Sequence, residues 1–353
     1  MRYLGIDLAW GEGSQVKPAN RSGVVSLESD GRIVHAGWTI GVDETIEWIE
    51  ANAVADTLLF VDAPLVIDNE TGQRLAERQV GQRYGKWWVS ANSTNTKSPR
   101  QAGVQLRRRL ADRGWRYDDG LDGPPQRGRS LSECYPYTAI VGAPELRYDD
   151  KRPAYKRAKK GMKAVESWPL RTSACDELIR RLAALADSDV PMDLLSHADT
   201  AALVRVRSPA VTAQYKKRED LLDAAICAWS AALWHRFGEQ RCQVLGADRD
   251  SPSIRPIASI IAPARPEQRD TSPRSGRASP SASAPRAKQK RSRQRASLAA
   301  DPSSSPRPAL SRWSATADIR SDHATRSGAS GWAMAVITTS SVSCTASVAF
   351  SEQ

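Results

Sequence analysis

The sequence predicts an α/β domain built on a mixed sheet, and three observations lead to this fold class. Apolar and amphipathic segments follow one another in the order strand, strand, strand, helix, strand. The run at 57–62 (TLLFVD) is apolar without alternation, as is typical of a central strand covered on both faces. Segments with helical spacing then recur up to residue 236, so the sheet is expected to carry several helices.

Spacing and turn residues place the individual elements. Residues 3–9, 22–28 and 32–40 predict strands, the last two joined by a turn at Gly31. Residues 43–54 predict a helix with Asp43 as its N-cap, because apolar side chains recur there at helical spacing. Further helices are expected near 72–84, 101–113, 174–187 and 219–236, short strands near 241–245 and 257–261, and a loop-rich insertion at 86–128.

The composition divides the chain at residue 270. Residues 1–269 predict the folded domain, whereas residues 270–353 are rich in Ser, Pro, Ala and Arg without periodicity, so a disordered tail is expected. The tail holds 12 Lys and Arg against 5 Asp and Glu, which is +7 of the net charge of +11 and leaves +4 for the domain. The basicity of the whole chain is therefore no argument for what the domain binds.

The sequence also predicts the cellular setting. There is no C-x-x-C pair, so neither a disulfide framework nor a structural zinc site is indicated by the five cysteines Cys134, Cys175, Cys227, Cys242 and Cys344. The chain opens on a strand, and no apolar run approaches the roughly 18 residues of a membrane span. A cytoplasmic protein without a membrane partner is expected.

Four carboxylates stand where acidic side chains are normally rare. Asp7 interrupts the apolar opening strand, and Asp62 ends the apolar run at 57–62. Glu133 lies in a third short strand segment, and Asp223 opens an apolar helix just after Asp220. An unpaired buried charge costs several kcal/mol, so a divalent cation is the usual reason for such a gathering. Carboxylate oxygens suit Mg²⁺ and Mn²⁺, the ions of two-metal phosphoryl transfer.

Structural roles remain open for the same residues. Asp62 precedes Ala63 and Pro64 and could cap a turn, Asp220 could be the N-cap of its helix, and Glu133 could pair with a nearby arginine. Asp7 is the hardest to explain structurally. Because Asp220 and Asp223 are three apart on a helix, they share a face, and both are candidate metal ligands.

Several motifs, in this order along residues 1–269, carry a resemblance to a known family. GIDLAWG at 5–11, VDAPL at 61–65, ECYPY at 133–137, EDLLDAAICAW at 219–229 and IIAPARPEQR at 260–269 resemble the predicted RNase H-like nucleases of a domain-of-unknown-function family. The resemblance implies an RNase H-like fold with a mixed five-stranded sheet in the order 3-2-1-4-5 and helices on both sides. By similarity to RuvC-type resolvases, Asp7 would be the first-strand acid and Asp62 the fourth-strand acid. Asp220 and Asp223 would lie on the closing helix, while Glu133 belongs to the family's own motif.

Basic residues interleaved with Trp87 and Trp88 are a second candidate feature. Such a pattern can hold a phosphate backbone and stack on unpaired bases, although a solvated helix face and two core tryptophans explain it almost as well. The candidate nucleic-acid contacts are Arg74, Arg78, Lys86, Arg100 and Arg107. A second basic run, from Lys151 to Lys163, is interpreted as ordinary surface.

These observations predict a metal-dependent nuclease that hydrolyses phosphodiester bonds of DNA or RNA with a metal-activated water. Asp7, Asp62, Asp223 and Asp220 would hold Mg²⁺ or Mn²⁺, and Glu133 would be a further ligand or a base. Two alternatives stay open: a nucleic-acid-binding adaptor with an inactive RNase H-like fold, and a nucleotide-binding protein of the actin and sugar-kinase type. The oligomeric state, and the choice between DNA and RNA, are left open by the sequence.

Overall fold

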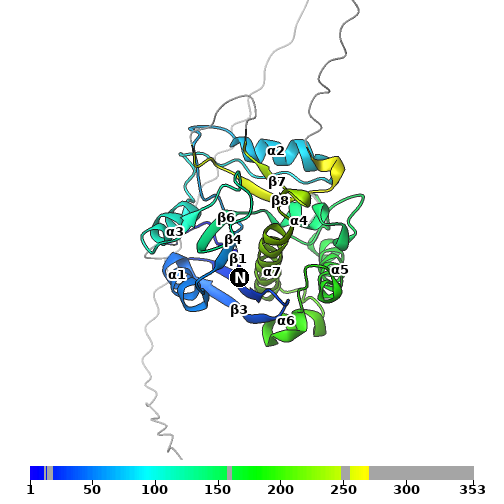
Figure 1. The fold of residues 1–353 in the computed structure, drawn as a ribbon. Helices are drawn as coiled ribbons and strands as arrows, with labels where there is room; N and C mark the ends of the chain where they lie inside the picture. The colour runs from blue at the N-terminus through cyan, green and yellow to red at the C-terminus, as the bar shows by residue number, and fades with distance from the viewer. Residues whose placement is uncertain (12, 14–18, 157–160, 248–254, 270–353) are drawn as a thin grey trace, which may run out of the picture. The chain divides into compact units, whose positions relative to one another are not determined.

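The structure is a computed structural model that describes residues 1–11, 13, 19–156, 161–247 and 255–269. The chain divides into two units, residues 1–280 and 281–353. The tail predicted at 270–353 lies outside the described residues, as does Cys344. Figure 1 shows the first unit, to which the following description is confined.

The main sheet has six strands in the order β3-β2-β1-β4-β6-β5, and β7 and β8 pair antiparallel in a separate two-stranded sheet. β2 is antiparallel to β1 and β3, whereas β1, β4, β6 and β5 run parallel. The strands are β1 (Arg2–Asp7), β2 (Arg21–Glu28), β3 (Ile33–Ile40), β4 (Thr57–Val61), β5 (Arg116–Tyr117), β6 (Arg129–Glu133), β7 (Cys242–Leu245) and β8 (Ile260–Pro263).

The prediction of a mixed sheet is confirmed, but the prediction of five strands is wrong. The five longer strands follow the expected order 3-2-1-4-5, with β6 as the fifth. The sixth strand, β5, is only two residues long and joins the outer edge of β6. A segment that short has no hydrophobic periodicity, so the sequence pattern could not reveal it.

The predicted helices are present, with two others that the spacing did not reveal, α4 and α6. The helices are α1 (Gly41–Asn52), α2 (Leu75–Tyr84), α3 (Ala102–Ala111), α4 (Pro136–Gly142), α5 (Ala164–Ala183), α6 (Ala198–Arg205) and α7 (Thr212–Phe237). α1 begins at Gly41, so Asp43 lies in its first turn and is not the N-cap. An acidic side chain in that turn still stabilises the helix through its dipole.

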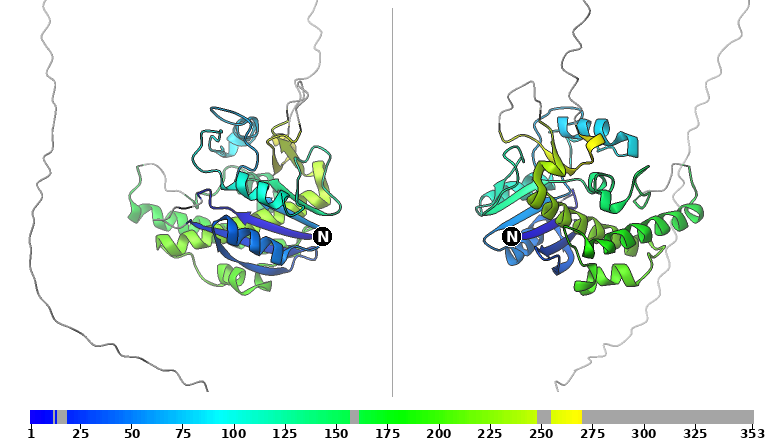
Figure 2. Two further views of the ribbon diagram at one scale, coloured as in Figure 1. Left: turned by 90° about the vertical axis from the view of Figure 1, so that its left-hand side faces the viewer. Right: turned by 45° about the vertical axis from the view of Figure 1, so that its right-hand side comes forward.

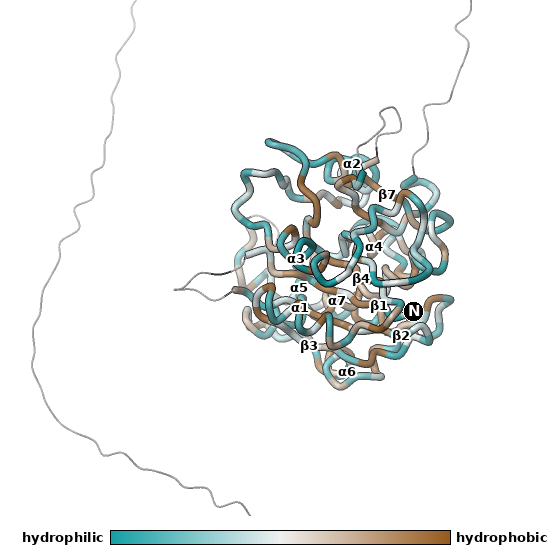
Figure 3. Tube along the Cα trace, turned by 60° about the vertical axis from the view of Figure 1, so that its left-hand side comes forward, coloured by the Kyte–Doolittle hydropathy of each residue, from teal (hydrophilic) through white to brown (hydrophobic). Residues whose placement is uncertain are grey.

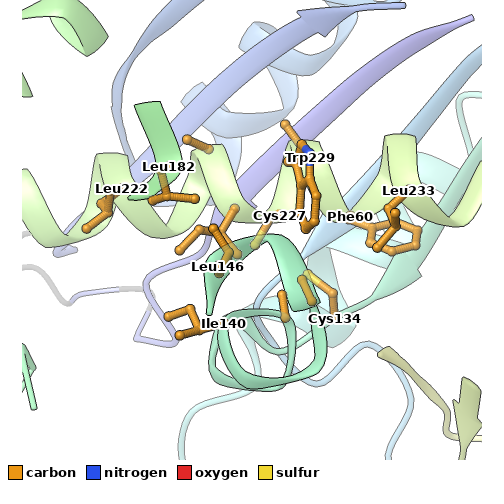
Figure 4. Packing of buried hydrophobic residues seen from close by; sticks show 14 of the residues in the cluster. Phe60, Cys134, Ile140, Leu146, Leu182, Leu222, Cys227, Trp229 and Leu233 are labelled. Carbon is orange, nitrogen blue, oxygen red and sulfur yellow. The ribbon is translucent and has the colours of Figure 1, made fainter. Parts of the chain in front are cut away.

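Helices cover both faces of the main sheet, as Figure 2 shows. α1 and α3 pack on one face, where the core includes Leu4, Ile6 and Leu106. α7 crosses the other face over β1, β2 and β4, and its side chains Cys227, Trp229 and Leu233 join a core that includes Phe60 of β4 (Figure 4). Figure 3 shows apolar stretches near β1 and α7 in the interior of this unit.

Two glycines allow α7 to lie unusually close to the sheet. A Cβ atom on Gly5 of β1 would lie 2.1 Å from the carbonyl oxygen of Ala224, and one on Gly23 of β2 would lie 2.0 Å from that of Asp220. Neither strand position can therefore carry a side chain while α7 keeps its place. Because strand side chains alternate, Asp7 points to the same face as Gly5 and so toward α7. This packing brings acidic residues of α7 to the end of β1.

Candidate metal centre

Three aspartates from three elements converge at one edge of the sheet. Asp7 is the last residue of β1, and Asp62 follows the last residue of β4, its parallel neighbour. The Asp62 amide donates a hydrogen bond of 2.8 Å to the Ile6 carbonyl, which holds the two strand ends together. Asp223 is delivered by α7, and one ligand oxygen from each of the three carboxylates lies within 4.8 Å of the others. Ligand sites in α/β sheets commonly form at this carboxyl edge.

The three aspartates meet the donor requirements of a hard divalent cation. They offer only oxygen ligands, and carboxylate oxygens are the ligands that Mg²⁺ and Mn²⁺ prefer. Asp7 and Asp62 line a cavity of about 500 Å³, so the cluster is open to an ion and a substrate. Asp223 is fully buried at the back of the cluster.

Asp220 does not belong to this group of converging oxygens. It lies one helical turn before Asp223, and its carboxylate pairs with Lys216 on the same helix. Asp220 nevertheless lines the same cavity as Asp7 and Asp62, so its role as a further metal ligand stays a prediction. The capping interpretation of Asp220 is wrong, because α7 begins at Thr212. The first turns of α7 are polar, so apolar periodicity in the sequence could not show where the helix begins.

Asp62 is not a turn cap in the described part of the chain, where its carboxylate accepts no backbone hydrogen bond and faces Lys156 at 3.9 Å. Lys156 and Tyr155 are functional-site residues that the sequence reasoning missed. The Lys156 Nζ atom lies 2.5 Å from Asp223 Oδ2, and the Tyr155 hydroxyl donates to Asp223 Oδ1 over 2.5 Å. Both residues come from an irregular segment inside the basic run, so no periodic signal pointed to them.

Four carboxylates and two ammonium groups lie close together in the cluster. The carboxylates belong to Asp7, Asp62, Asp220 and Asp223 and the ammonium groups to Lys156 and Lys216, and three arginines, Arg21, Arg100 and Arg152, line the same cavity. Burial, reinforced by Asp223, raises the pKa of Asp7 well above its ordinary value. Burial also raises the pKa of Asp62 to about 7, although Lys156 opposes the shift. A group of acids that resists ionisation in this way is a site that a divalent cation would stabilise.

Glu133 ends β6, beside Asp62, but its carboxylate is fully engaged elsewhere. Arg74 donates to it twice, over 2.6 and 2.8 Å, and the Leu65 amide donates over 3.0 Å. The interpretation of Glu133 as the partner of an arginine is thus confirmed, and a direct role as metal ligand or base does not fit these contacts. Because Arg74 also donates to the Val66 carbonyl, the pair anchors the loop that follows Asp62.

The structure places the five candidate nucleic-acid contacts in different surroundings. Arg74 is 2% exposed and bound to Glu133 and Glu77, so its predicted contact with a phosphate backbone is wrong. Arg100 lines the cavity with Asp7 and Asp62. The side chains of the other three lie elsewhere: Arg78 donates to the Gln73 carbonyl, Lys86 lies over the Trp87 ring, and Arg107 lies over the Tyr117 ring. Trp87 is buried as a core residue would be, whereas Trp88 is 74% exposed.

Comparison with known protein families found a match. Residues 5–250 match the model of a family described as "Protein of unknown function (DUF429)". The chain belongs to the DUF429 family. The comparisons with curated proteins and with solved structures found no match. The match includes the end of β1 together with β4, β6 and α7, so all three aspartates lie inside the DUF429 domain. Over the described residues of the chain, no helix is long and apolar enough to cross a membrane.

Proposed function

We propose that the DUF429 domain of this chain is a metal-dependent nuclease that hydrolyses phosphodiester bonds in DNA or RNA. The observation that carries the proposal is the convergence of Asp7, Asp62 and Asp223 at the carboxyl edge of β1 and β4. The sheet order of the longer strands, with α7 crossing toward the first strand, supports placing the domain among RNase H-like folds. The match to the family model fits the same assignment without fixing an activity.

Asp7, Asp62 and Asp223 would hold one or two Mg²⁺ or Mn²⁺ ions. When bound, such ions activate water for attack on phosphorus and neutralise charge on the phosphate. Tyr155 fixes the orientation of Asp223 by donating to one of its oxygens. Lys156 and Arg100 line the same cavity and would attract the anionic backbone of a nucleic acid. The Glu133–Arg74 pair would hold the loop after Asp62 in place, and with it the Asp62 side chain.

Cleavage of labelled single-stranded, duplex and branched DNA and RNA tests the proposal. We expect cleavage of at least one substrate with Mg²⁺ or Mn²⁺ and none with EDTA. Binding without cleavage under all these conditions would favour the inactive adaptor. Tight ATP binding with neither cleavage nor nucleic-acid binding would favour the nucleotide-binding alternative.

Lys156 is expected to contribute directly to this activity. Replacing it with methionine keeps the length of the side chain but removes the positive charge beside Asp62 and Asp223. We expect kcat to fall by about 10²-fold, the usual cost of losing one electrostatic contact in a catalytic site. The K156R variant should recover part of the loss, and K97M, at an exposed lysine, is the matched control. Unchanged kcat in K156M would remove Lys156 from the mechanism.

A further inference from the structure

A second cavity, of about 680 Å³, adjoins the candidate metal centre. Its walls come from residues 147–154, from α5 and from Trp88. Arg152 lines both this cavity and the one that contains Asp7 and Asp62, so the two cavities are neighbours at that side chain. The volume lies in the range of small-ligand sites.

Trp88 stands at this cavity without a packing role of its own. Its side chain is 74% exposed, whereas that of its neighbour Trp87 is 2% exposed. It ends the short helix η1 (Gly85–Trp87) with a φ of 64°, a left-handed conformation that is costly for a large side chain. Two hydrogen bonds from Arg152 hold this backbone: its amide donates to the Trp87 carbonyl over 3.0 Å, and its Nε donates to the Trp88 carbonyl over 2.7 Å. The fold thus holds a flat aromatic surface toward solvent.

Arg152 links the tryptophan to the metal centre. Its guanidinium lies 4.2 Å from the centre of the Tyr137 ring, and Tyr137 lines the metal-centre cavity. Lys156 lies over the same ring at 5.3 Å. Arg152 and Lys156 therefore both contact the Tyr137 ring. This cation–aromatic cluster connects the Trp88 backbone, which Arg152 binds, with Asp223, which Lys156 binds.

The described walls of the second cavity are more basic than acidic. Two of its acids are paired, Asp149 with Arg265 and Glu177 with Arg180 and Arg181. Asp150 makes no ion pair within the described residues, and neither do the exposed side chains of Arg147 and Lys151. With Arg152 added, positive charges exceed negative ones beside the exposed indole. An exposed aromatic ring flanked by cations is the arrangement that binds an unpaired base and its phosphate.

We propose that this cavity is a subsite for an unpaired nucleotide of the substrate, with the base stacked on Trp88 and its phosphate near Arg147 and Lys151. This inference rests on the proposed nuclease function and narrows its substrate class to nucleic acid that is single-stranded beside the cleaved bond. Bases inside a duplex are already stacked on each other and cannot reach the indole.

The test is a binding experiment in EDTA, so that binding is measured without cleavage. Fluorescence anisotropy gives the Kd of short fluorescein-labelled single strands, of the matching duplex, and of single strands with one abasic site at each position in turn. The proteins are the full chain, W88A, W88F and the control V206A, which truncates an exposed apolar residue that does not line either cavity.

We expect W88A to weaken single-strand binding by about 10-fold or more, the usual effect of removing one stacking ring. W88F should stay close to the unsubstituted chain, and duplex binding should not change. One abasic position should weaken binding by the unsubstituted chain and cause no further loss in W88A. Equal Kd values for W88A and the unsubstituted chain would overturn the subsite. So would the absence of any position at which an abasic site weakens binding by the unsubstituted chain but not by W88A.

The same experiment separates the subsite from the nuclease proposal. Metal-dependent cleavage by a chain whose W88A variant binds normally would keep the nuclease and reject the subsite. Weaker single-strand binding in W88A that is coupled to one abasic position, without cleavage by any form of the protein, would keep the subsite and reject the nuclease. No binding of single strands by the unsubstituted chain would overturn the subsite as well.

Discussion

Replacing Asp7 with asparagine is expected to abolish metal-dependent cleavage and, at the same time, to stabilise the metal-free domain. Cleavage should fall by about 10³-fold or more, because a ligand of the catalytic ion is lost. The metal-free domain should become more stable, because burial disfavours the charged form of Asp7 and asparagine carries no charge. A purely structural aspartate would show the opposite pattern, with lost stability and retained activity.

Thermal unfolding in EDTA and in Mn²⁺ measures the stability part of this prediction. The unsubstituted chain should gain stability from Mn²⁺, and D7N should gain much less. D122N is the matched control, because Asp122 is an exposed carboxylate that pairs with Arg255 and does not line the cavity with Asp7 and Asp62. It should behave like the unsubstituted chain in both conditions.

Lowering the pH should act in the same direction as D7N. Burial raises the pKa of Asp62 to about 7 in the folded domain, whereas an unfolded aspartate titrates near its ordinary value. The metal-free domain therefore binds a proton more tightly than the unfolded chain does. Its stability should fall as the pH rises through about 7, and D7N should weaken this dependence. A stability that does not change between about pH 4 and pH 7 would contradict the raised pKa.

Replacing Arg74 with methionine is expected to destabilise the domain by about 3–5 kcal/mol, the cost of removing one partner from a buried ion pair. Glu133 would lose two hydrogen bonds and Glu77 one, and all three side chains are almost fully buried. R78M, at an exposed arginine on the next turn, should change stability by less than about 0.5 kcal/mol. Chemical denaturation measures both variants.

The double variant R74M/E133Q distinguishes a positioning role of Arg74 from direct contact of Arg74 with nucleic acid. Neutralising Glu133 should recover part of the stability lost in R74M, since the uncompensated charge is then gone. If Arg74 instead contacted nucleic acid, R74M would weaken binding without changing the free energy of unfolding. That outcome would contradict the buried pair.

The sequence was sufficient to predict Asp7, Asp62 and Asp223, because acids at the ends of apolar strands and inside an apolar helix conflict with their surroundings. It could not separate Asp220 from Asp223, since spacing of three shows a shared helix face but not which oxygen reaches the strands. That outcome depends on Gly5 and Gly23, which set the distance between α7 and the sheet.

Other parts of the site depend on contacts that have no sequence period. Tyr155 and Lys156 reach Asp223 from irregular chain, and Arg74 reaches Glu133 across 59 positions. Basic residues near tryptophans predicted nucleic-acid contact for Arg74, but burial gave it a structural role instead. The same burial pattern separated Trp87 from Trp88, which are equivalent in the sequence pattern.

The most direct test of the central claim is a Mn²⁺ titration followed by electron paramagnetic resonance, which distinguishes bound from free ion. The unsubstituted chain should bind Mn²⁺, D62N and D223N should lose this binding, and D122N should retain it. Equal Mn²⁺ binding by D62N and the unsubstituted chain, or no binding by the unsubstituted chain, would contradict a metal centre formed by Asp7, Asp62 and Asp223.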